Sequence, residues 1–197
     1  MTRQAKRNRI TKETSIDIAV DLDGSGRGDL ATGIGFFDHM LDQLARHGGL
    51  DLTVHVTGDL HIDTHHTVED VGILLGTVLG EALGDKAGVR RFANVRVPLD
   101  EALVDVALDL SGRPYLHWEL EYPQQQVLYG TPPFDAQLAE EFFRAVVGGA
   151  GITMHVELVR GRNTHHIIEA TFKAVARALR DAVRVEGDAI PSTKGTL

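Results

Sequence analysis

The chain contains an internal repeat, and this repeat constrains the fold more than any other feature. His65 and Glu69 recur as His165 and Glu169, so the two copies are offset by 100 residues. Repetition on this scale outweighs local propensity as evidence of fold, so we predict a duplicated unit of strands, helix, strand and helix. The match extends to further pairs at the same offset: Gly48 and Gly148, Thr53 and Thr153, and Leu79 and Leu179.

The periodicity of apolar residues predicts the elements within each copy. Residues 14–22 alternate between apolar and polar side chains, which is typical of a strand with one buried face. Apolar residues at spacings of three and four follow both His65 and His165, and this spacing predicts a helix after each motif. With 197 residues, 43% of them hydrophobic, the chain can bury a sizeable core. We expect one domain, 1–197, made of two repeats at about 1–110 and 111–197.

The repeated motif is a pair of adjacent histidines followed by a glutamate. The first copy reads THHTVED from Thr64, and the second reads THHIIEA from Thr164. On a helix, residues three and four apart share a face, whereas neighbours diverge, so each copy is expected to serve two metal ions. The alternative is that these are ordinary polar residues at helix starts, with Thr64 and Thr164 as N-caps. Capping requires no histidine pair, so the repetition favours metal binding.

An approximate two-fold relation between the copies would produce two similar metal sites. We expect His65 and Glu69 to join His166 at one ion, and His165 and Glu169 to join His66 at the other.

Composition limits the kind of metal and the kind of partner. The chain has no cysteine, so any metal must be held by histidine, carboxylate and water, and carboxylate favours a hard ion such as manganese. A net charge of -8 and a pI near 5.6 disfavour a general nucleic-acid or anionic-membrane surface and favour a small-molecule partner. No apolar run has the length of a signal peptide or a membrane span, so a cytoplasmic location is expected.

Several residues outside the motif pairs are candidates for the same site. His39 and Gln43 lie four apart on a predicted helix, and the repeat places Ala139 opposite His39, so only one half supplies this histidine. A histidine also precedes each motif on a strand, His55 or His155, and only one of the two is needed as a ligand. Residues 122–133 have no helical or strand periodicity and are expected to form a loop. Residues 190–195 have the composition of a frayed terminus.

The motifs together resemble the imidazoleglycerol-phosphate dehydratase family of histidine biosynthesis. They are RxTxET, TGIGFFDHML, GDLxIDxHHTVED, DEAL, DLSGRP, GRNTHHIIEATFKA and STKG, in this order over essentially the whole chain. The resemblance implies the dehydratase alone, without a fused phosphatase domain. It implies an α+β fold of two duplicated halves, each a mainly antiparallel four-stranded sheet with two helices packed on one face. It also implies two manganese ions per active site and a homo-oligomeric shell of twenty-four subunits.

The same resemblance implies roles for individual residues. The catalytic residues are Glu13, as acid and base, and Glu169. The metal ligands are His39, His65, His66, Glu69, His155, His165, His166 and Glu169. The substrate-binding residues are Glu13, Gln43, Arg91, Arg113, Lys173, Ser192 and Lys194, among which the basic groups suit the substrate phosphate.

The implied reaction converts D-erythro-imidazoleglycerol phosphate to imidazole acetol phosphate. If both ring nitrogens bind metal, the ring persists as an imidazolate that expels the neighbouring hydroxyl and leaves a diazafulvene-like intermediate. Loss of the next proton then produces an enol that tautomerises to the ketone. Two metals in near-symmetric sites match the two nitrogens of one ring.

Two other functions are compatible with the histidine and glutamate clusters. One is a noncatalytic metal-binding shell protein, in which Glu13 and the basic residues are ordinary surface charges. The other is a two-metal phosphatase that activates water. Under the dehydratase hypothesis we also expect the full site to need more than one subunit, because the ligands on both motif helices are not expected to converge within one fold.

Overall fold

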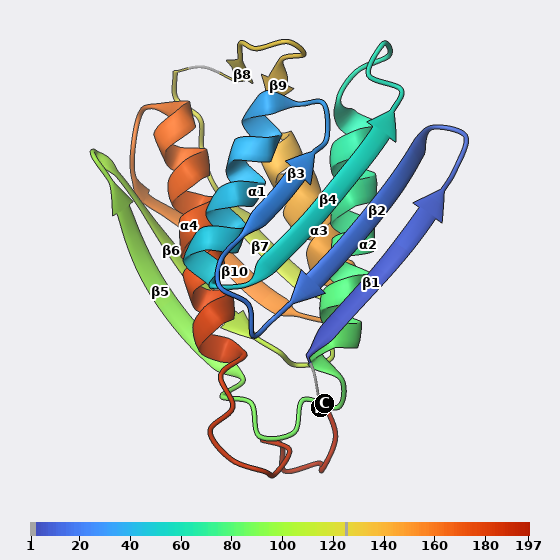
Figure 1. Ribbon diagram of the computed structural model, residues 1–197. Coiled ribbons are helices and arrows are strands. Elements are labelled where there is room, and N and C mark those ends of the chain that lie inside the picture. The colour runs from blue at the N-terminus through green and yellow to red at the C-terminus, as the bar shows by residue number, and fades with distance from the viewer. Residues whose placement is uncertain (1–2, 125) are drawn as a thin grey trace.

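Two four-stranded sheets form the outer layers of the molecule, and four helices lie between them (Figure 1). The structure is a computed structural model that describes residues 3–124 and 126–197. Helices α1 and α2 pack on the first sheet, and α3 and α4 pack on the second. Across the middle layer, α1 packs against α4 and α2 packs against α3.

The first half of the chain forms one sheet and two helices. Its elements in chain order are β1 (Gln4–Ile10), β2 (Thr14–Asp21), β3 (Gly28–Ala31), α1 (Gly35–Gly48), β4 (Asp51–Gly58) and α2 (His65–Leu83). The second half follows the same plan with β5 (Phe92–Leu99), β6 (Ala102–Asp109), β7 (Tyr115–Glu119), α3 (Leu138–Ala150), β10 (Thr153–Arg160) and α4 (Thr164–Ala182). A small hairpin of β8 (Val127–Leu128) and β9 (Phe134–Asp135) is inserted between β7 and α3.

The two sheets have equivalent strand orders, β1-β2-β4-β3 and β5-β6-β10-β7. In each sheet the first three strands pair antiparallel, and the last pair, β3 with β4 or β7 with β10, is parallel. The predicted fold class is confirmed: each half is a mainly antiparallel four-stranded sheet with two helices on one face.

The halves divide at a different point from the predicted boundary near residue 110. Strands β5 and β6 lie before residue 110, yet β6 pairs with β10 and both belong to the second sheet. The connection between the halves is therefore the segment 84–91, which follows α2. The physical reason for the difference is that hydrogen bonding between distant strands assigns β5 and β6 to a sheet, and their local periodicity carries no such information.

Segment 122–133 also differs from the prediction. We expected a loop, and part of it is strand β8, where Val127 pairs with Asp135 and Leu128 with Phe134. Gln125, in the same segment, lies outside the described residues.

Alternation in β2 explains how the first sheet faces the helices. Ile16, Ile18 and Val20 are almost fully buried, while Asp17 between them is exposed on the outer face. Because successive side chains of a strand point to opposite faces, this pattern directs one face of the sheet to the core and the other to solvent.

An aromatic cluster joins the two halves in the middle layer. The Phe37 ring from α1 lies 5.2 Å from Phe142 of α3 between centroids, and Phe142 lies 5.5 Å from Phe172 of α4. All three rings are fully buried. The hydrophobic core therefore includes residues from both halves.

Helices α2 and α3 approach each other closely through glycine. A Cβ added at Gly76 of α2 would meet the carbonyl oxygen of Val146 at 2.5 Å, and one added at Gly149 of α3 would meet the backbone nitrogen of Thr77 at 2.8 Å. The missing side chains allow this backbone contact. It holds α2, which carries the first histidine motif, in position.

Both motif helices begin at the same end of the molecule (Figure 1). That end is the top of the view, beside β8 and β9, whereas the C-terminus and the segment after α4 lie at the bottom. Within the described part of the chain, no helix is both long enough and apolar enough to span a membrane.

Candidate metal and substrate site

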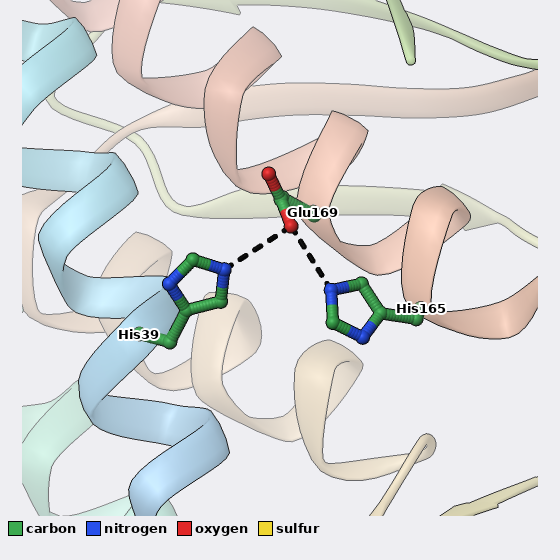
Figure 2. Close-up of side chains that lie close together, drawn as sticks. All are labelled: His39, His165 and Glu169. Carbon is green, nitrogen blue, oxygen red and sulfur yellow. Dashed lines mark hydrogen bonds and ion pairs between the residues drawn. The ribbon is translucent and has the colours of Figure 1, made fainter. Parts of the chain in front are cut away.

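The second motif forms a compact cluster with a histidine from the neighbouring helix. His165 and Glu169 lie four residues apart on α4, and His165 Nε2 is 3.0 Å from Glu169 Oε2. His39 on α1 brings its Nε2 to 3.2 Å from the same oxygen (Figure 2). The structure thus brings together three of the predicted metal ligands, because α1 packs against α4. Gln43 lies 3.5 Å from His39 Nδ1 on the same face of α1.

Glu169 is held as a carboxylate by the groups around it. Burial raises its pKa, but hydrogen bonds from Lys173, His165 and His39 outweigh this effect and bring the pKa down to about 2. Lys173 Nζ is 2.5 Å from Oε1, so the two oxygens face different partners. Oε2 faces both imidazoles and is the oxygen that a shared cation would meet.

The first motif has the same design with a longer contact. His65 Nε2 lies 3.7 Å from Glu69 Oε2, with both side chains more than two-fifths exposed. Thr64 occupies the N-cap position of α2 as suggested, but its side chain makes no cap hydrogen bond, and Asp63 accepts from His65 N at 2.8 Å instead. The N-cap of α4 is Asn163 and not Thr164, because the Asn163 side chain accepts from His166 N at 3.3 Å.

The second histidine of each motif, His66 or His166, is paired with a carboxylate that the sequence analysis did not single out. His66 Nδ1 lies 2.9 Å from Asp59, and His166 Nδ1 lies 2.7 Å from Glu101. The hydrogen bond to Asp59 raises the pKa of His66. The hydrogen bond from His166, with one from the Asn163 backbone, lowers the pKa of Glu101 to about 2. A carboxylate at Nδ1 fixes the proton there and leaves Nε2 free to bind a metal.

Glu13 lies in the turn between β1 and β2, beside the first motif. Its carbonyl oxygen accepts the Asp59 N–H at 3.1 Å, and its own N–H donates to Thr11 Oγ1 at 3.1 Å. After the Asp59 hydrogen bond, the charge of Glu13 also contributes to the raised pKa of His66. The predicted acid and base is therefore close to a predicted metal ligand.

The pairing expected between the two motif copies is not made within one chain. Among the described residues, ligand atoms meet within 4.8 Å in two groups of three, namely His39 with His165 and Glu169, and a separate group on the outer face of the second sheet. Neither group contains His66 or His166, whose Nδ1 atoms face their own carboxylates. The reason is that α2 packs mainly against α3 while α4 packs mainly against α1.

His155 also lies apart from the cluster. It is exposed on β10, on the face of the sheet opposite the helices, with its ring 5.3 Å from that of His117 between centroids. Its counterpart His55 forms an ion-pair contact of 3.0 Å with Asp29. His155 therefore does not join the His39, His165 and Glu169 cluster within the chain.

Four of the predicted substrate-binding residues line one cavity at the opposite end of the molecule. Arg91, Arg113, Ser192 and Lys194 surround a volume of about 510 Å³, together with Pro191, Thr193, Thr196 and Leu197.

Arg91 is fixed in this cavity by several contacts. It makes a two-point contact with Asp109 at 2.7 and 3.1 Å and donates to the Pro191 carbonyl at 2.7 Å. The segment expected to be a frayed terminus thus forms one wall of a basic cavity. Lys173, which was grouped with these residues, is instead bound to Glu169.

The cluster and the basic cavity lie at opposite ends of α4. The Arg91 N–H donates to the carbonyl of Ala182, the last residue of the helix, whereas His165 is in its first turn. At a rise of about 1.5 Å per residue, the two ends are separated by about 26 Å.

Comparison with known proteins identifies the family of this chain. The model of the imidazoleglycerol-phosphate dehydratase family matches residues 32–179. The chain belongs to this family.

Relatives support the assignment to the dehydratase family over the full length. An imidazoleglycerol-phosphate dehydratase from Granulibacter bethesdensis is 60% identical, covering 100% of both chains, and one from Cereibacter sphaeroides is 57% identical, covering 99% of this chain and 100% of the relative. The crystal structure of the dehydratase from Staphylococcus aureus has a TM-score of 0.82 at 40% identity and covers 92% of this chain and 99% of that chain. The structure from Pyrococcus furiosus has a TM-score of 0.82 at 37% identity, with coverages of 97% and 100%.

Within this dehydratase, Asp59 and Glu101 were missed although both lie in motifs that carried the resemblance. Asp59 belongs to GDLxID and Glu101 to DEAL. The available signal was an acidic residue inside each motif, but only the folded chain shows which histidine each carboxylate contacts.

Proposed function

We propose that the chain catalyses the dehydration of D-erythro-imidazoleglycerol phosphate to imidazole acetol phosphate in histidine biosynthesis. The observation that carries the proposal is the presence of two chemically matched half-sites, a histidine and glutamate cluster suited to the imidazole end and a basic cavity suited to the phosphate end. The substrate loses the hydroxyl beside its ring and a proton from the next carbon, and the resulting enol tautomerises to the ketone.

The histidine cluster fits a hard divalent cation. His39 Nε2, His165 Nε2 and a Glu169 oxygen lie within 4.8 Å of one another, and Glu169 is already ionised. Two imidazoles and a carboxylate suit manganese, and we propose two manganese ions per active site, with His65, His66, Glu69, His155 and His166 as the remaining ligands. When bound, manganese supplies Lewis-acid polarisation of the substrate imidazole.

Asp59 and Glu101 act in this proposal as positioning residues. Each accepts from Nδ1 of a motif histidine, so the Nε2 lone pair is directed away from the carboxylate. The same arrangement occurs in both halves, although the two carboxylates come from different connections. Asp59 follows β4, and Glu101 lies in the turn between β5 and β6.

Glu13 is proposed as the acid and base of the reaction. Its side chain is exposed in a turn beside Asp59 and His66, so a substrate ring bound near His66 would lie next to this carboxylate. A carboxylate in this position accepts the proton from the carbon next to the departing hydroxyl. Glu169, also proposed as catalytic, keeps its carboxylate charged through Lys173.

The basic cavity is proposed to bind the substrate phosphate. Arg91 presents a guanidinium held in place by Asp109, and Arg113, Ser192 and Lys194 add donors around the same volume. Guanidinium and ammonium groups are suited to phosphate oxygens.

A substrate with a three-carbon chain cannot bridge the two half-sites of one subunit. They lie about 26 Å apart along α4. We therefore propose that each active site takes its metal cluster from one subunit and its basic cavity from another, so that the protein works as a homo-oligomer, expected to be a shell of twenty-four subunits. A cytoplasmic location stays a prediction.

Subunit complementation tests this proposal. Glu169→Gln and Arg113→Gln should each abolish manganese-dependent formation of the ketone product, because each removes one half-site from every chain. Oligomers reassembled from equal amounts of both variants should regain about a quarter of wild-type activity, since an intact cluster then meets an intact cavity. No recovery in properly mixed oligomers would refute the shared site.

Two further outcomes identify the competing functions. Release of inorganic phosphate from the substrate would indicate a phosphatase. Manganese binding without any product, in wild type, would indicate a noncatalytic metal-binding protein. Replacing Glu13 with Gln should abolish turnover while manganese content stays unchanged.

A further inference from the structure

A second group of potential metal ligands lies on the outer face of the second sheet. We call it the sheet-face cluster, and it consists of His117 and Glu119 on β7 and Glu157 on β10. Residues two apart on a strand share a face, so His117 and Glu119 project together. The parallel register places Glu157 directly beside Glu119. All three therefore point away from the helices, because Met154 and Val156, which alternate with the exposed positions of β10, are buried.

The ligand atoms of this cluster are already close together. One imidazole nitrogen and one oxygen of each carboxylate lie within 4.8 Å of one another. His117 Nε2 is 3.5 Å from Glu119 Oε2. Small side-chain rotations would bring these atoms to the ~2.0–2.2 Å that nitrogen and oxygen ligands adopt around zinc.

The two carboxylates lie side by side with no arginine or lysine partner among residues 3–124 and 126–197. Glu119 and Glu157 lie side by side on adjacent parallel strands, so their like charges repel each other. In the described part of the chain, neither forms an ion pair with an arginine or lysine, whereas the nearby Asp105 pairs with Arg96 at 2.7 Å. A cation between the carboxylates would remove the repulsion.

The first sheet shows that this cluster is not a by-product of the duplication. At the equivalent parallel pair, β3 with β4, Ala31 lies beside His55 where His117 lies beside His155. The offset of 100 places Thr57 where the second half has Glu157. One half of the molecule therefore has a cluster of ligands, and the other provides a matched comparison.

We propose that His117, Glu119 and Glu157 bind one divalent zinc-type ion per chain. The site is distinct from the His39, His165 and Glu169 cluster, which lies among the helices on the opposite side of the sheet. Because β7 is the edge strand of its sheet, the ion would link this edge to β10 and stabilise the fold. Imidazole with carboxylates is a ligand set that zinc accepts.

Zinc binding to the full-length protein tests the proposal. The probe is Zn²⁺ added to metal-free protein, followed by removal of free ion and metal analysis. His117→Ala and Glu157→Gln should each bind one zinc per chain fewer than wild type. The control His55→Ala, on β4 where the second sheet has His155, should retain the wild-type number.

Stability and activity provide two further readouts. Zinc should raise the thermal unfolding midpoint of His117→Ala less than that of wild type, because ligand binding stabilises the folded state. Manganese-dependent turnover of Glu119→Gln should stay at the wild-type level, because Glu119 lies beside Glu157 and not beside the proposed manganese ligand His155. This separates the zinc site from the proposed active site. Equal zinc content in wild type, His117→Ala and Glu157→Gln would overturn the proposal, whether or not the dehydratase activity is found.

Discussion

Replacing Glu101 with glutamine should weaken one of the two classes of metal site. Glu101 Oε2 accepts from His166 Nδ1 at 2.7 Å, while Oε1 accepts the backbone N–H groups of Asn163 and Arg162 at 2.8 and 3.2 Å. Glutamine keeps an oxygen for the two backbone donors, so the start of α4 should stay folded. Its NH₂ group would face Nδ1, which must then accept, and the ring proton moves to Nε2. That tautomer cannot bind a metal through Nε2.

The size of this effect follows from the role of the carboxylate. Loss of a partner that orients a metal-binding histidine costs about 10- to 100-fold in metal affinity. This corresponds to about 1.4 to 2.8 kcal/mol of binding free energy. Titrating metal-free protein with Mn²⁺ and following the free ion by electron paramagnetic resonance should resolve one class of sites weakened by this factor and a second class unchanged.

The neighbouring residue supplies a matched control for the Glu101 experiment. Asp100 Oδ2 lies 3.9 Å from His166 Nε2, and its side chain is 77% exposed. Its φ of 48° is in the left-handed region that asparagine tolerates, so Asp100→Asn should fold normally. We expect its manganese affinity to match wild type. Wild-type affinity at both classes of manganese site in Glu101→Gln, or an equal loss of affinity in Asp100→Asn, would contradict the positioning role of Glu101.

Two further predictions concern stability. Gly76→Ala should lower the free energy of unfolding by about 1 to 2 kcal/mol, because overpacking against the Val146 carbonyl outweighs a gain of about 1 kcal/mol in helix propensity. In the control Gly148→Ala, no heavy atom lies within 4 Å of the new methyl group, so the free energy of unfolding should rise. Both free energies are measured by urea denaturation. A change in the same direction in both variants would contradict the close contact between α2 and α3. Glu169 has a folded pKa of about 2 against an ordinary 4.5, so its contribution to stability is present above pH 4.5 and is lost as pH falls toward 2. In urea denaturation of metal-free protein, the free energies of unfolding of wild type and Glu169→Gln should differ by roughly 3 kcal/mol at most at pH 7. The two free energies should converge at low pH. A difference that does not change with pH would be evidence against the charged carboxylate.

Much of the fold followed from periodicity and repetition. Alternation predicted the strand at residues 14–22, and the spacing after His65 predicted α2, because burial on one face leaves a local signature. The strand pairing that assigns β5 and β6 to the second sheet leaves no such signature. The predicted boundary near residue 110 therefore differed from the boundary between the sheets.

The candidate site was predictable in its ligand types but not in its partners. His39 was a candidate because metal ligands were expected nearby, and its 3.2 Å contact with Glu169 depends on the packing of α1 against α4. Glu101 was missed for a different reason. It occupies the turn between β5 and β6, as Glu13 occupies the turn between β1 and β2, but these positions are separated by 88 residues. A constant offset of 100 cannot align two turns whose flanking connections differ in length.

The separation of the two half-sites along α4 limits how subunits can be arranged. If the cluster of one chain must meet the basic cavity of another, each productive contact joins two unlike surfaces. Such contacts complete every site only when the arrangement closes on itself, by a two-fold axis between antiparallel neighbours or by a ring. An open array would leave an unused cluster at one edge and an unused cavity at the other. Closure of the particle, rather than the folding of any single chain, would then decide how many clusters and cavities meet to form complete active sites.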